Sequence, residues 1–75
     1  MSFNTKLTND LIKIATAGGG FRLDAKTRLT DELVQLAAAA KTGGATVIFS
    51  GTGMFSTQDL IRIGAAGKGA VIFED

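Results

Sequence analysis

Residues 30–50 read TDELVQLAAAAKTGGATVIFS, and this stretch decides the fold. Apolar residues at positions 33, 36 and 37 recur at the spacing of a helix that is buried along one side. Two glycines follow at positions 43 and 44, and glycine after a helix adopts the left-handed conformation at low cost. The run 45–49, ATVIF, is then rich in β-branched and aromatic residues, which favour a strand. The stretch predicts a helix, a glycine turn and a strand, in that order.

The same unit occurs three times. The aligned helical segments are 8–17 (TNDLIKIATA), 30–39 (TDELVQLAAA) and 57–66 (TQDLIRIGAA). The strand-like runs that follow the glycines are 21–23, 45–49 and 70–73. Successive strands that are joined through a helix should be parallel. The sequence therefore predicts a single α/β domain, residues 1–75, made of three helix–glycine turn–strand repeats (about 7–28, 29–55 and 56–75), with a small parallel three-stranded sheet and the helices on one face.

Each repeat carries signals for the start of a helix. The expected N-caps are Thr8, Thr30 and Thr57, because a threonine hydroxyl can accept a hydrogen bond from a free N–H of the first turn. Leu7 and Leu29 precede two of these threonines, and we expect them to pack onto their helices as hydrophobic staples. Arg62 follows Asp59 by three residues, so we expect an ion pair within that helix.

The amino-acid composition argues against several classes of function. The chain has 75 residues, no Cys and no His. A domain of this size buries only about 60–65% of its unfolded surface, and without disulfides or imidazole and thiolate metal sites, oligomerisation is the remaining source of added stability. The formal net charge of +1 is too small to imply a nucleic-acid or membrane partner. No apolar run approaches a membrane span and no targeting segment is visible, so a cytoplasmic location is expected.

Few residues in the sequence could support catalysis or ligand binding. Serine and threonine hydroxyls are present, but the chain has no His to activate them and no Cys to act as a nucleophile. We therefore expect no enzyme activity, no catalytic residues and no cofactor. The glycine clusters follow helices, which is the wrong end of the helix dipole for a phosphate. Only Ser50-Gly51-Thr52-Gly53 follows a strand and precedes a helix. A tight structural turn is favoured there over a phosphate site.

The order of strand, short loop and helix resembles the α/β solenoids of leucine-rich-repeat type. The resemblance rests on residues 47–55, VIFSGTGMF, followed by Leu60 and Ile63 as returning apolar residues. Asp24, Ser50 and Glu74 stand where such repeats usually carry asparagine. The resemblance implies stacked repeats and protein binding, and it implies no catalytic role.

Alternation along the strands predicts which side chains are free for contact. If Phe21, Leu23, Val47, Phe49, Val71 and Phe73 face the helices as core residues, then Arg22, Ile48 and Ile72 face the uncovered side of the sheet. The last strand, with Val71 and Phe73, should also form an open edge, and exposed β-branched edges are templates for pairing. We therefore expect a protein interface at Arg22, Ile48, Ile72, Val71 and Phe73.

The leading hypothesis is a structural protein that self-assembles into homo-oligomers or filaments through this interface. The alternative is a small binding module or inhibitor that docks a foreign protein by the uncovered sheet face. A third interpretation makes the isoleucines ordinary surface residues, with Met1–Lys6 folded over one edge of the sheet. The expected partner is thus a second copy of the chain or another protein, with no nucleic acid and no membrane.

Overall fold

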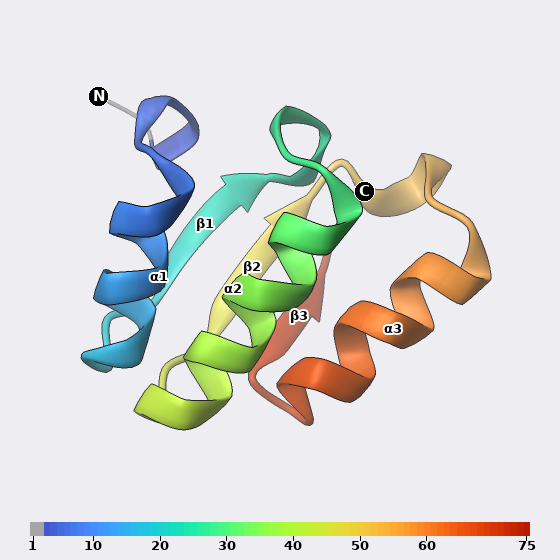
Figure 1. Ribbon diagram of the computed structural model, residues 1–75. Helices are drawn as coiled ribbons and strands as arrows, with labels where there is room; N and C mark the ends of the chain where they lie inside the picture. Colours follow the sequence, from blue (N-terminus) through green and yellow to red (C-terminus); the bar gives the residue numbers. More distant parts are fainter. Residues whose placement is uncertain (1–2) are drawn as a thin grey trace.

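The computed structural model describes residues 3–75 (Figure 1). Its helices are α1 (Thr8–Thr16), α2 (Thr30–Gly43) and α3 (Thr57–Gly67), and its strands are β1 (Phe21–Asp24), β2 (Val47–Ser50) and β3 (Val71–Phe73). Short 3₁₀-helices, η1 (Phe3–Thr5), η2 (Ala25–Thr27) and η3 (Thr52–Met54), precede the three α-helices in turn. None of the helices in residues 3–75 is long and apolar enough to span a membrane. The predicted α/β fold of three helix–strand units is confirmed.

The three strands form one parallel sheet in the order β1-β2-β3. Figure 1 shows α1, α2 and α3 side by side over a single face of this sheet, with α2 in the middle. Phe21, Val47 and Val71 are aligned across the strands, as are Leu23, Phe49 and Phe73. The three helix–strand units thus lie side by side, and within residues 3–75 no helix covers the opposite face of the sheet.

The core lies between the helices and the sheet. Its largest fully buried side chains are Leu11, Leu23, Leu33, Leu36, Val47, Phe49 and Ile63. They come from all three helices and from β1 and β2. Alternation along the strands directs the buried strand side chains to the helix side. Small residues let the elements approach closely. A Cβ on Gly43 would lie 2.1 Å from the carbonyl oxygen of Ala15, so the end of α2 contacts the backbone of α1 directly.

The helix starts differ from the sequence prediction. The N-caps of α1 and α2 are Leu7 and Leu29, one residue before the expected threonines, and that of α3 is Ser56, whose hydroxyl accepts from the N–H of Asp59. Leu7 and Leu29 are 72% exposed, so the predicted hydrophobic staples are wrong. The leucine side chains cannot accept hydrogen bonds as caps, and in α2 the replacement contact is made to the backbone N–H of the N-cap residue itself.

Glu32 supplies that replacement. Its carboxylate accepts the N–H of Leu29 at 3.0 Å and the hydroxyl of Thr8 at 2.9 Å, so it holds the start of α2 and joins it to α1. Thr8 is therefore a donor between helices and not a cap. Arg62 likewise pairs with Asp31 of α2 at 2.8 Å and not with Asp59. Contacts between neighbouring helices replace the predicted contacts within one helix.

Candidate interaction surface

The uncovered face of the sheet carries the three residues that the sequence placed there. Arg22, Ile48 and Ile72 lie in register on β1, β2 and β3. Ile48 is half-buried and Ile72 is 47% exposed. The structure therefore brings the predicted residues together in one row, and Ile72 is the most accessible aliphatic side chain of that row.

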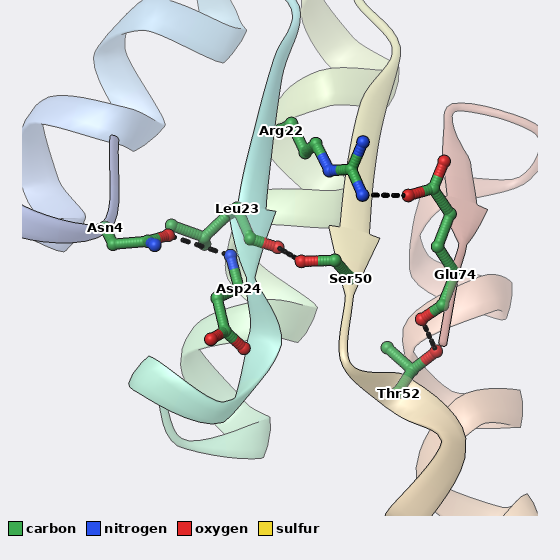
Figure 2. Close-up of polar contacts among 7 residues, drawn as sticks. All are labelled: Asn4, Arg22, Leu23, Asp24, Ser50, Thr52 and Glu74. Carbon is green, nitrogen blue, oxygen red and sulfur yellow. Dashed lines mark hydrogen bonds and ion pairs between the residues drawn. The ribbon is translucent and has the colours of Figure 1, made fainter. Parts of the chain in front are cut away.

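An ion pair crosses this face. Arg22 and Glu74 are joined at 2.6 Å, and Figure 2 shows the Arg22 side chain reaching across β2 toward Glu74. Both side chains are partly exposed, and such pairs stabilise a fold by at most about 1 kcal/mol. The pair matters more for the character of the surface, since it covers the carboxyl-terminal half of β2 with charge. The free face is thus polar at one end and aliphatic near Ile72.

The open edge of the sheet is β3. Val47 donates its N–H to the carbonyl of Ala70, and Glu74 donates its N–H to the carbonyl of Phe49. Because backbone groups alternate along a strand, those of Ile72 also point to β2, and those of Val71 and Phe73 point away from the sheet. β3 is the last strand in the sheet order. The N–H and C=O groups of Val71 and Phe73 are therefore available to another strand.

The side chains of Val71 and Phe73 face α3, as predicted. A Cβ on Gly67 would meet Val71, and one on Gly64 would lie 3.9 Å from the ring of Phe73. Phe73 is nevertheless 37% exposed, so its expected place in the core is wrong. The reason is positional: β3 has a neighbouring strand on one side only, and Gly64 offers no side chain to cover the ring.

The first edge of the sheet, in contrast, is partly covered by the segment that precedes α1. The Asn4 side-chain oxygen accepts the outward N–H of Asp24 at 2.8 Å (Figure 2). The Phe3 ring stacks on that of Phe21 with centroids 5.3 Å apart. Arg28 secures the segment by donating to the carbonyls of Asn4 and Lys6. Phe3–Thr5 therefore folds over β1, as one of the alternative interpretations of the sequence held, whereas Met1 and Ser2 lie outside the described residues.

The turn at Ser50–Gly53 uses its hydroxyls for structure. Ser50 donates to the carbonyl of Leu23 at 3.3 Å, and the buried Thr52 donates to that of Glu74 at 2.8 Å (Figure 2). The N–H of Thr52 donates to the same Glu74 carbonyl at 2.9 Å. Gly51 takes the left-handed conformation that the turn requires, with φ +70°. This arrangement fits the structural turn that the sequence favoured.

Other hollows in the described part of the chain are shallow and open to solvent. One of about 510 Å³ lies where η1 meets the starts of α1 and α2, and its walls include Arg28 and Glu32, which already hold protein atoms. Among residues 3–75, no group of three acidic side chains is placed to hold a metal ion. The β3 edge, with the outward backbone groups of Val71 and Phe73, therefore remains the candidate interaction surface.

Comparison of the chain with protein-family models, with curated proteins and with solved structures found no match.

Proposed function

We propose that this protein is a non-enzymatic structural protein that associates with copies of itself through the open edge of its sheet. The observation that carries the proposal is the difference between the two edges. β1 is covered by Asn4 and Phe3, whereas β3 leaves the backbone groups of Val71 and Phe73 unused beside the exposed Ile72. Unused backbone groups on an edge strand favour the addition of a further strand.

The flank of α3 supports the same surface. Gly64 lies over the Phe73 ring, and Ile61, one turn earlier on the same side of the helix, is 56% exposed. Ile61, Ile72 and Phe73 are three of the six large apolar side chains that are exposed in residues 3–75. They gather at the end of the molecule where the stack of helix–strand units stops.

Size-exclusion chromatography with light scattering, from micromolar to millimolar protein, tests the proposal. We expect a mass above that of the 7.7 kDa monomer that rises with concentration until it reaches a plateau. A monomer at every concentration would overturn self-association.

The second candidate is a partner protein that adds an extended segment to β3. Backbone pairing does not depend on side-chain identity, so the same N–H and C=O groups could bind such a segment. This partner is favoured over docking on the uncovered face, which the Arg22–Glu74 pair makes polar at one end. The stacking surface implied by the resemblance to leucine-rich-repeat solenoids and the cytoplasmic location both stay predictions.

A further inference from the structure

The two edges of the sheet also determine the symmetry of the assembly. A filament that continues the sheet would pair β3 of one copy with β1 of the next, in a head-to-tail contact. The N–H of Asp24 on β1 is already taken by Asn4, and Phe3 stacks beside it on Phe21. β3 has no such cover in residues 3–75, so we expect two copies to continue their sheets by joining β3 to β3.

We infer that the protein closes as a two-fold symmetric dimer in which β3 pairs antiparallel with β3 of a second copy, in register about Ile72. This inference rests on the self-association proposed above. A contact between identical surfaces related by a two-fold axis closes on itself. The product is one continuous six-stranded sheet, with the Asn4 and Phe3 segments covering both of its outer ends.

The register follows from the direction of the backbone groups. The outward groups belong to Val71 and Phe73, so each Val71 must exchange hydrogen bonds with the partner's Phe73. This gives about four backbone hydrogen bonds and leaves the two copies of Ile72 opposite each other, as the close, non-hydrogen-bonded kind of pair. Every residue of β3 is then paired, whereas a shift by two residues along the strand leaves part of it unmatched.

Side chains on both faces of the seam agree with this register. On the helix side, Val71 meets the partner's Phe73, and the exposed part of each Phe73 ring becomes covered. On the free face, the two exposed Ile72 side chains cover each other. The antiparallel direction also brings Lys68, which precedes β3 and is exposed, toward the partner's Asp75, which follows β3 and is exposed. Opposite charges therefore meet at both ends of the seam.

A single cysteine tests the register. The chain has no cysteine of its own, so Ile72→Cys places one thiol per subunit, on an exposed position. Directly opposite residues of a non-hydrogen-bonded antiparallel pair lie within disulfide reach, so oxidation should give about tenfold more covalent dimer than the control Ile48→Cys. The control thiol lies on the same face but one strand away from the seam. Circular dichroism confirms that both variants are folded.

The outcomes separate the inference from the proposed function. A covalent dimer for Ile72→Cys with little for Ile48→Cys supports the two-fold register. Equal cross-linking of both variants, or none for Ile72→Cys although light scattering shows oligomers of the wild type, overturns the register and leaves self-association standing. A wild-type protein that is monomeric by light scattering overturns both.

Discussion

The side-chain oxygen of Asn4 lies 2.8 Å from the backbone nitrogen of Asp24, and this contact takes up one of the outward backbone groups of β1. It makes the two ends of a nearly repetitive molecule different. The end at β1 is partly covered by a segment of its own chain, and the end at β3 has no such cover in residues 3–75. This difference determines which edge of the sheet we expect to pair between copies.

Removal of the cover on β1 should change the size of the assembly. We expect the double substitution Phe3→Ala, Asn4→Ala to produce species larger than a dimer, because β3 can then pair with the exposed β1 of another copy. The loss of the ring stack and the hydrogen bond should lower the free energy of unfolding by about 1–3 kcal/mol. Sedimentation velocity measures the size distribution, with the exposed Asn9→Ala on α1 as the control. A variant that remains dimeric would contradict the role given to this segment.

A charge placed at the seam should separate the copies. We expect Ile72→Lys to yield a monomer, because two ammonium groups would face each other where two isoleucines meet, and like charges directly opposite are destabilising. Far-UV circular dichroism should be unchanged, since Ile72 is exposed on the free face of the sheet. The matched control is Leu29→Lys, which adds the same charge at an exposed leucine away from β3 and should leave the oligomer intact. An oligomer that survives Ile72→Lys would place the interface elsewhere.

The close contact between α1 and α2 should make Gly43 sensitive. We expect Gly43→Ala to lower the free energy of unfolding by about 2 kcal/mol or more, because the new methyl group would overlap the carbonyl oxygen of Ala15. Its neighbour Gly44 has open space around it but a φ of +72°, so Gly44→Ala should cost only about 1 kcal/mol. Urea denaturation at one fixed protein concentration compares the two. Equal losses would show that α1 and α2 do not approach as closely as described.

Glu32 should make stability depend on pH. Its hydrogen bonds from the Leu29 N–H and the Thr8 hydroxyl hold the pKa of the carboxyl below its ordinary value of 4.5. Because the folded pKa is lower than the unfolded one, the stabilisation is present above pH 4.5 and is lost as the pH falls through the folded pKa. We expect the wild type to lose more stability than Glu32→Gln over this acid range, with Thr8→Ala in between. Identical pH profiles for the wild type and Glu32→Gln would contradict this linkage.

Thr52 tests the role of the Ser50–Gly53 turn. We expect Thr52→Val to lower the free energy of unfolding by about 1–2 kcal/mol, because the buried hydroxyl that donates to the Glu74 carbonyl is lost while the side-chain shape is kept. Ser50→Ala should have a smaller effect, since its bond to Leu23 is longer and Ser50 is only half-buried. Inorganic phosphate should not raise the melting temperature of the wild type. A rise that Thr52→Val abolishes would make the turn an anion site.

The order of elements follows from the sequence because each repeat contains strong local signals. The spacing of Leu33, Leu36 and Ala37, the glycines at 43 and 44, and the β-branched run that follows each favour one conformation without help from the rest of the chain. Alternation along such strands then places Arg22, Ile48 and Ile72 on the free face, where the structure has them.

The details that the sequence missed depend on contacts between repeats. Thr8 resembles a cap, but Glu32, which lies 24 residues away, draws its hydroxyl to α2. Within the third repeat, α3 continues to Gly67, and the residue after it in the left-handed conformation is Lys68, with φ 42°, in place of a glycine. The cover that Asn4 places on β1 is also beyond local patterns, because it joins residues 20 positions apart.

Amide hydrogen exchange at β3, followed by NMR at high and at low protein concentration, tests the central claim most directly. The N–H groups of Val71 and Phe73 point away from the sheet, whereas that of Ile72 points to β2. We expect Val71 and Phe73 to exchange slowly at high concentration and rapidly on dilution, while Ile72 keeps the same protection relative to its neighbours in β2. Rapid exchange of Val71 and Phe73 under conditions where light scattering shows an oligomer would contradict the claim that β3 forms the interface.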